Sequence, residues 1–405
     1  MKALGPLPAG FEADAHWRLL IGGRDAEAVV EAAGGTPLFV YDSSLISDQV
    51  AQFRAAFPNV ALHYAVKANP HAPLLETIAS LVDGFDVASA GELGRVAHLG
   101  LPISFAGPGK RDEELETAIR AGITINLESE GEAERALAIC QRERLAAKLA
   151  VRANPPFGLK GSGQKMGGLP SQFGIDHDRA PALIRRIIEA GADWQGLHIF
   201  AGSQALHADA LIELQRETVA LAASIAGEAG HAPPHVNLGG GFGIPYFAKD
   251  EPLDVEAVGA ALAKTLADRP KILADTEFAI ELGRWLVGEA GVYLTRIVDR
   301  KESRGKTFLV TDGGLQHQLA ASGNFGQLLR PNYPVANASR FGAQAEEEVT
   351  ISGCLCTPLD LLADEVMLPR TEVGNLVAIF CAGAYGLTAS PASFLSQPLA
   401  REMIV

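Results

Sequence analysis

A lysine stands at the end of a short apolar run, in the segment 62–67, and Pro70 follows it closely. The alternation of Tyr64 and Val66 predicts a β-strand, and Pro70 predicts its end. A charged amine where a buried strand ends is costly unless it has a partner or forms a covalent bond. Because desolvation lowers the pKa of an amine and makes it a nucleophile towards aldehydes, Lys67 is a candidate for a Schiff base. Most lysines at strand ends are ordinary surface residues, so the assignment depends on other segments.

Three further segments have residue types suited to binding a phosphate. Residues 239–241 are three consecutive glycines after an expected strand, and glycines let backbone N–H groups approach an anion closely. Ser203 adds a hydroxyl, and Arg284 adds a guanidinium that can bind two phosphate oxygens. A triple glycine alone is more often a tight turn. Together with a Schiff-base lysine, these segments indicate pyridoxal 5′-phosphate, whose aldehyde reacts with an amine and whose ring accepts electrons.

A carboxylate that faces the pyridine nitrogen keeps this ring protonated and strengthens its pull on electrons. Glu281 is the candidate, because it ends an expected strand. It also stands three residues before Arg284, so an ion pair between these two side chains is the alternative. The spacing leaves both interpretations open.

These residues need elements that bring them together. Between about residue 62 and residue 286, short apolar runs alternate with amphipathic stretches. The expected strands are 62–66, 85–88, 103–106, 124–127, 149–152, 196–200, 236–238 and 279–281. Ser89 and Ser129 are each followed three residues later by a glutamate, which predicts a helix start after a strand. Eight strand–helix alternations predict an α/β fold with a (β/α)8 barrel, like that of alanine racemase; an open doubly wound sheet is the alternative.

After about residue 288 the pattern changes to short alternating strands without long helices between them, at 292–298, 307–310, 349–355, 376–381 and 401–405. We therefore expect three parts. They are an N-terminal segment 1–35 that packs with the β domain, a cofactor-binding barrel at 36–287, and a C-terminal β domain at 288–405.

Composition limits the possible functions. The chain has 405 residues and a net charge of −14 without long charged runs, which argues against binding to nucleic acid or to an anionic membrane. No apolar run reaches membrane-spanning length, and the first ten residues do not resemble a secretion signal, so we expect a cytoplasmic protein. Cys354 and Cys356 have no second Cys or His pair at zinc-ligand spacing, so no metal site is expected.

Taken together, these motifs give the chain a resemblance to the fold-type III pyridoxal-phosphate decarboxylases, the family of diaminopimelate and ornithine decarboxylases. The resemblance runs from about residue 36 to the C-terminus. Its landmarks are the segments 64–69, 85–89, 202–204, 239–242, 281–284, 356–360 and 383–386.

The resemblance implies a Schiff base at Lys67, a pyridinium contact at Glu281, and return of a proton to the substrate by Lys67 or Cys356. The cofactor contacts that it implies are Lys67, Asp86, His198, Phe200, Ser203, Gly239, Gly240, Gly241, Glu281, Arg284 and Tyr385. It further implies a head-to-tail homodimer, in which Cys356 and Asp312 enter the partner's site and contact the substrate.

Two positions depart from this family. The residue that stacks on the cofactor ring is usually histidine, whereas this chain has Phe200, and His198 stands two residues earlier on the same strand face. Members that recognise an amine carry an acidic residue after the cysteine, whereas this chain has Thr357. Loss of a buried ion-pair partner costs about 3–5 kcal/mol, so free diaminopimelate, ornithine or lysine is not the expected substrate. Asp312 remains a possible anionic contact.

The segments 157–168, 172–176, 198–204 and 354–357 resemble those of a specialised-biosynthesis subgroup. This subgroup includes the carrier-protein glutamyl decarboxylase and decarboxylases associated with exosortases. An amino acid tethered to an acyl carrier protein needs no acidic pocket for its far end. Lys160 and Lys165 could contact an acidic carrier, although simple solvation explains them equally well.

Three alternatives remain at this point. The first is a decarboxylase that acts on free diaminopimelate, ornithine or lysine. The second is an amino-acid racemase, which would favour an arginine at the pyridine nitrogen and a second base, and so fits Glu281 and Cys356 poorly. The third is a non-enzymatic pyridoxal-phosphate carrier protein, which would lack the β domain.

Overall fold

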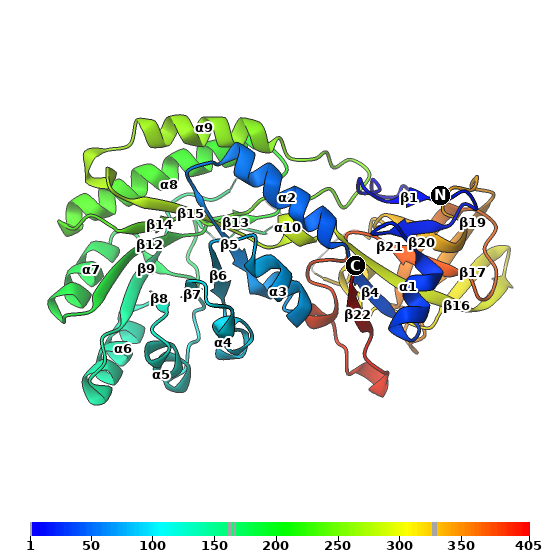
Figure 1. The fold of residues 1–405 in the computed structure, drawn as a ribbon, viewed down its shortest axis with the longest axis horizontal. Helices are drawn as coiled ribbons and strands as arrows, with labels where there is room; N and C mark the ends of the chain where they lie inside the picture. The colour runs from blue at the N-terminus through cyan, green and yellow to red at the C-terminus, as the bar shows by residue number, and fades with distance from the viewer. Residues whose placement is uncertain (1, 160–163, 166, 326–329) are drawn as a thin grey trace. The chain divides into compact units, whose positions relative to one another are not determined.

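The computed structural model describes residues 2–159, 164–165, 167–325 and 330–405 (Figure 1). The chain divides into two compact units. The barrel unit contains Val50–Gly243 and Pro252–Gly283. The β unit contains Met1–Gln49, Ile244–Glu251 and Arg284–Val405.

The barrel unit is built on a closed ring of eight parallel strands. In spatial order they are β9 (Lys148–Asn154), β12 (Asp193–Ile199), β14 (His235–Asn237), β15 (Glu277–Leu282), β5 (Ala61–Ala65), β6 (Gly84–Val87), β7 (Ile103–Phe105) and β8 (Thr124–Leu127). β8 pairs with β9 and closes the ring. The predicted (β/α)8 barrel is therefore confirmed, and the open-sheet alternative is wrong.

Helices surround these strands in Figure 1. They are α3 (Ala72–Ala79), α4 (Ala90–Val96), α5 (Asp112–Arg120), α6 (Glu130–Glu143), α7 (Ala180–Glu189), α8 (Ala208–Ala229) and α9 (Val255–Ala267). The two predicted helix starts are present, because Ser89 Oγ accepts from the N–H of Glu92 and Ser129 Oγ accepts from the N–H of Glu132, each at 3.1 Å. No helix in the described ranges is both long and apolar enough to cross a bilayer.

Short strands extend two of the loops that follow barrel strands. β11 (Ile175–Asp176) pairs in parallel with the end of β9. β10 (Gln164–Lys165) pairs antiparallel with β13 (Gly202–Ser203). Lys160 and the side chain of Lys165 lie outside the described part of the structure, so the contacts expected of them stay a prediction.

The β unit contains a mixed sheet in the order β18 (Val335–Asn337), β21 (Leu376–Ile379), β16 (Gly291–Ser303), β17 (Lys306–Thr311), β19 (Glu347–Ser352) and β20 (Leu361–Leu368). β4 (Leu38–Tyr41) pairs with both β16 and β22 (Arg401–Ile404). This separate β domain confirms the predicted fold class.

N-terminal elements complete the β unit. A small sheet of β1 (Glu12–Ala13), β2 (Leu19–Ile21) and β3 (Arg24–Asp25) leads into α1 (Ala26–Ala33). Side chains of β2 and α1 share one buried core with side chains of β4, β16 and β21. α2 (Ser43–Ala56) contributes residues to both units.

Candidate active site

Polar side chains line the interior of the barrel near the C-terminal ends of its strands. Strand register places Glu281 beside His63, and it places His198 beside both Arg152 and Asn237. Since neighbours in register point to the same face of a sheet, these residues belong to one interior surface. Glu281 and His198 were predicted as site residues from the sequence, whereas His63, Arg152 and Asn237 were not.

Glu281 is buried and has two polar neighbours within the barrel. Its Oε2 lies 3.1 Å from Nε2 of His198, and it accepts a hydrogen bond from Nδ2 of Asn237 at 3.2 Å. Burial alone would raise the pKa of Glu281, but His198 and the positive charges of Lys67 and Arg152 lower it to about 2. The carboxylate is therefore an anion at neutral pH, which is the state that a pyridinium contact requires.

Lys67 follows β5 in a one-turn 3₁₀ helix, Val66–Ala68. The sequence predicted a strand through residue 66 and a buried amine; the strand instead ends at Ala65, and the Lys67 side chain is exposed. Its Nζ lies 5.5 Å from the centre of the Phe200 ring. The amine is therefore accessible to an aldehyde and faces the residue that stands at the ring-stacking position.

The three glycines follow β14 and approach two neighbouring segments very closely. A Cβ on Gly240 would lie 1.9 Å from the carbonyl oxygen of Glu281, and one on Gly241 would lie 2.6 Å from that of Gly202. Gly239 and Gly241 also have positive φ angles of 71° and 87°, which favour glycine. Only glycines fit this backbone. The N–H of Gly239 already donates to Asn237 Oδ1 at 2.8 Å, so the expected anion contact through Gly239 is occupied, and the N–H groups of Gly240 and Gly241 are the ones that can reach an anion.

Ser203 and Phe200 stand near these glycines. Ser203 lies on β13, directly after Gly202. Phe200 Cδ2 would be 3.0 Å from a Cβ on Gly239, and the Phe200 ring centre lies 6.5 Å from that of His198. The phenyl ring thus lies between the lysine and the first glycine, although it offers no hydrogen bond.

Asp86 lies on β6 and is buried, with neither carboxylate oxygen in a hydrogen bond to any described residue. Nδ1 of His63 lies 3.5 Å from its Oδ2. Buried polar atoms are usually paired, so unpaired ones indicate a group still to be bound or bridged. Nδ1 of His198 likewise has no hydrogen-bond partner among the described residues.

In the β unit, Arg284 lies against two tyrosine rings. The guanidinium carbon is 5.4 Å from the ring centre of Tyr246 and 4.6 Å from that of Tyr385, and Nη1 donates a hydrogen bond of 2.7 Å to the Tyr246 hydroxyl. Burial raises the pKa of Tyr246 to about 12, so this hydroxyl stays neutral. The Arg284 Nε has no hydrogen-bond partner among the described residues.

The predicted substrate residues of the β unit differ in their availability. Cys356 is exposed. Both carboxylate oxygens of Asp312 already accept hydrogen bonds. Oδ1 accepts from Thr295 Oγ1 at 2.7 Å and from the Arg296 N–H at 2.9 Å, and Oδ2 accepts from the Thr36 hydroxyl. An ammonium group would have to compete with these bonds.

The loop that carries Cys356 and Thr357 is held by a buried carboxylate. Oδ1 of Asp360 accepts from the Leu315 N–H at 2.7 Å, and Oδ2 accepts from the Leu355 N–H at 2.8 Å. Thr357 Oγ1 accepts from the Leu359 N–H at 3.3 Å. Thr357 thus has a role within its own turn and carries no charge.

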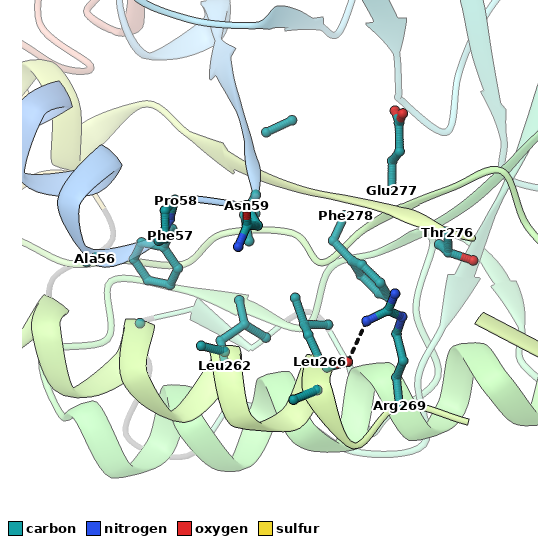
Figure 2. Close-up of a pocket in the computed structure, with 15 residues that line it drawn as sticks. Ala56, Phe57, Pro58, Asn59, Leu262, Leu266, Arg269, Thr276, Glu277 and Phe278 are labelled. Carbon is teal, nitrogen blue, oxygen red and sulfur yellow. Dashed lines mark hydrogen bonds between the residues drawn. The ribbon is translucent and has the colours of Figure 1, made fainter. Parts of the chain in front are cut away.

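A cavity of about 650 Å³ lies at the opposite end of the barrel. Its lining includes residues at the N-terminal starts of β5 and β15, and Figure 2 shows Leu262 and Leu266 of α9 pointing towards Phe57 and Phe278. The lining is mainly apolar. Because chemistry in such barrels lies at the C-terminal ends of the strands, this cavity is not the candidate active site.

These features fit pyridoxal 5′-phosphate. The barrel provides an accessible lysine, an anionic glutamate and a glycine backbone that can approach a phosphate. No group of three or more His, Cys, Asp or Glu side chains in the described residues is arranged to hold a metal ion.

Comparison with known proteins gives a consistent result. Residues 43–288 match the family "Pyridoxal-dependent decarboxylase, pyridoxal binding domain". The chain is 36% identical over 379 residues to the L-glutamyl-[BtrI acyl-carrier protein] decarboxylase of Niallia circulans, covering 91% of this chain and 88% of that protein. It is 31% identical over 381 residues to the diaminopimelate decarboxylase of Archaeoglobus fulgidus, covering 92% and 88%.

A solved structure is similar over nearly the whole length. The diaminopimelate decarboxylase of M. jannaschii, determined with L-lysine, matches with a TM-score of 0.88 and 26% identity, covering 99% of this chain and 94% of that one. Family model, relatives and fold agree, so the cofactor is pyridoxal 5′-phosphate and the protein is a carboxy-lyase. The chain belongs to the family of pyridoxal-phosphate-dependent decarboxylases that includes the diaminopimelate decarboxylases.

Proposed function

We propose that this decarboxylase removes the α-carboxylate of an aminoacyl group that is tethered to an acyl carrier protein. The observation that carries this proposal is that neither Thr357 nor Asp312 offers an unoccupied acidic group to a substrate. Thr357 has no charge, and both oxygens of Asp312 already accept hydrogen bonds within the β unit. A free distal ammonium would therefore find no acidic side chain at residue 357 and would have to compete for the oxygens of Asp312, whereas a tethered acyl group needs neither.

The relatives support this substrate class. The Niallia circulans protein is named for a glutamyl group on an acyl carrier protein, and its identity of 36% exceeds the 31% of the Archaeoglobus fulgidus diaminopimelate decarboxylase. Free diaminopimelate is the second candidate, because several relatives carry that name. An amino-acid racemase is a poorer candidate, since an anionic Glu281 strengthens the electron sink that racemases of this fold weaken.

When bound, pyridoxal 5′-phosphate supplies an aldehyde for the amine and a ring that accepts the electron pair left when the Cα–carboxylate bond breaks. Lys67 would hold the cofactor through its Nζ and would release it to the substrate amine. Glu281 would keep a proton on the ring nitrogen, because its own pKa of about 2 leaves the carboxylate ionised. Lys67 or Cys356 would return a proton to Cα after the loss of carbon dioxide.

The remaining contact residues bind the cofactor and take no part in the chemical steps. We assign the phosphate to the N–H groups of Gly240 and Gly241, the Ser203 hydroxyl, Arg284 and Tyr385. The rings of Tyr246 and Tyr385 restrict the guanidinium of Arg284, so its unpaired Nε–H is oriented before an anion arrives. Phe200 contacts the cofactor ring by stacking alone.

We further propose a homodimer in which Cys356 acts in the partner's active site. Cys356 is exposed, which suits a residue that crosses an interface. All four cysteines are free thiols, and we place the enzyme in the cytoplasm on that ground.

Carbon dioxide release tests the substrate assignment. Glutamyl and other aminoacyl carrier proteins are compared with free meso-diaminopimelate, ornithine and lysine at equal concentration. The proposal expects a carrier-bound substrate to give the higher kcat/KM. Efficient turnover of free diaminopimelate with no turnover of any carrier would reject it.

A Thr357→Asp variant sharpens this test, with Thr357→Val as its uncharged control. If the missing charge sets the preference, the aspartate raises kcat/KM for free diamino acids while the valine does not. An equal response of both variants would show that the substrate preference does not depend on the charge at residue 357.

A further inference from the structure

His63 is a histidine of the barrel interior to which the decarboxylase chemistry described so far gives no role. It lies on β5, with β15 on one side and β6 on the other. Its register partners are Glu281 on β15 and Gly84 on β6. His63 and Glu281 are therefore adjacent residues on the same face of the sheet.

The imidazole lies over β6. A Cβ on Gly84 would be 3.0 Å from Nε2 and 3.1 Å from Cδ2 of His63, so the ring occupies space that any other residue at 84 would fill. Nδ1 of His63 lies 3.5 Å from Oδ2 of Asp86. The absent side chain at 84 thus lets the ring reach across the strand towards a carboxylate.

The surroundings of this ring are negatively charged. Asp86, Glu281 and Asp83 all act on His63, and together they raise its pKa even though burial alone would lower it. Asp83 is the weakest of the three and is itself paired with Arg54 at 2.6 Å. Asp86 has no hydrogen-bonded partner among the described residues, and the one ion-pair contact given for it there is the 3.5 Å approach of His63 Nδ1.

Two buried carboxylates on adjacent sides of one strand repel each other unless a cation lies near both. Glu281 also has His198 and Asn237, but Asp86 has neither. We propose that His63 is protonated in the working enzyme and is a positioning residue that places a positive charge between the carboxyl groups of Asp86 and Glu281. This inference rests on the proposed function only for its catalytic consequence, because the protonation itself is a property of the barrel.

The sign of the pH dependence follows from the direction of the shift. A histidine whose pKa is raised on folding stabilises the protein fully below its unfolded-state pKa, which is about 6.5. That contribution disappears as the pH rises through the higher folded-state pKa. Removal of the imidazole should therefore lower stability more at about pH 6 than at about pH 9.

The direct test is a nuclear magnetic resonance titration of the histidine side chains in the full-length protein. The His63 signal is identified as the one missing from His63→Gln. The proposal expects His63 to titrate above the ordinary histidine value of about 6.5 and expects Asp86→Asn to move this midpoint downwards. A midpoint at or below about 6.5, or one unmoved by Asp86→Asn, would overturn it.

Catalysis provides a second readout. His63→Gln is expected to lower kcat on the order of tenfold, the effect of one pKa unit on a neighbouring carboxylate, and to change the pH profile of kcat. His231→Gln is the matched control and should leave both unchanged. A lower kcat with an unaltered pH profile would mean that His63 only fills space, and the positioning role would fall.

The protonation of His63 and the proposed decarboxylase function can be rejected independently of each other. A raised His63 midpoint together with unaffected turnover in Glu281 variants would reject the proposed function while the charge assignment stands. An ordinary His63 midpoint with strong Glu281 dependence would do the reverse.

Discussion

Substitution of Glu281 by glutamine tests the electronic role of this residue without a change in size. The pKa of Glu281 is about 2, against an ordinary value of 4.5, which corresponds to an interaction on the order of 3 kcal/mol that favours the anion. Glutamine keeps a hydrogen-bonding group near Asn237 but removes this charge, so His198 and any protonated ring nitrogen lose their anionic partner. The negative charge of Glu281 helps the cofactor ring to withdraw electrons from the substrate. If the same energy of about 3 kcal/mol is lost in the transition state, kcat should fall on the order of 100-fold.

The assay is initial-rate carbon dioxide release, measured alongside the cofactor content of each preparation. Cofactor content should change little, since the glycine segment and Arg284 are unaltered. Glu277→Gln is the matched control, because Glu277 lies on the same strand with a side chain that is 79% exposed, and it pairs with His235 at 3.2 Å. A kcat for Glu281→Gln within about twofold of the wild type would refute the electronic role.

Further predictions concern the lysine, the glycine segment, the cysteine and acid stability. Lys67→Ala should lose the visible absorption band of the imine-bound cofactor on dialysis, and a retained band would contradict the lysine assignment. Gly240→Ala should lower the free energy of unfolding by about 1–3 kcal/mol and weaken cofactor binding, because its Cβ would lie 1.9 Å from a carbonyl oxygen; Gly94→Ala, with open space around it, should do neither in denaturant titrations. Inactive Cys356→Ala and Lys67→Ala proteins should regain part of their activity when mixed if subunits share active sites, and no recovery would argue against sharing. As the pH falls from about 4.5 towards 2, Glu281 becomes protonated, so its contribution to stability, which is complete above about pH 4.5, should be lost in acid denaturation curves and be missing in Glu281→Gln.

Much of the barrel could be predicted from the sequence because each strand is short, apolar and followed by a helix start. Ser89 and Ser129 marked two of these starts through their spacing to a glutamate, and both serines cap helices. The strand ends were less predictable. Val66 was taken as strand because it alternates with Tyr64, but the chain turns into a 3₁₀ helix there, which places Lys67 on an exposed turn.

In the β unit, the sequence pattern was weaker. The strand Leu361–Leu368 was missed, because its residues do not alternate strictly between apolar and polar. Leu38–Tyr41 pairs with Gly291–Leu294 and with the C-terminal strand, and such long-range pairing leaves no local signal in the sequence. The domain boundaries at residues 36 and 288 stay a prediction.

Several residues of the candidate site could be predicted from their type, but the sequence does not show which side chains contact one another there. Asn237, Arg152 and His63 were missed although each is a polar residue directly beside an apolar residue of its strand, which is the signal that could have found them. Tyr246 was missed because nothing in the sequence shows that it contacts Arg284, 38 residues later. Asp312 was correctly noted as acidic, but only the structure shows that its oxygens are occupied.

The central claim is that Lys67 carries the cofactor opposite an anionic glutamate. Reduction of the purified holoenzyme with borohydride fixes the imine as a stable amine, and peptide mass spectrometry then locates it. The account predicts one pyridoxyl-phosphate adduct on the peptide that contains Lys67, lost in Lys67→Ala. An adduct on another lysine, or a loaded enzyme with none on Lys67, would contradict it.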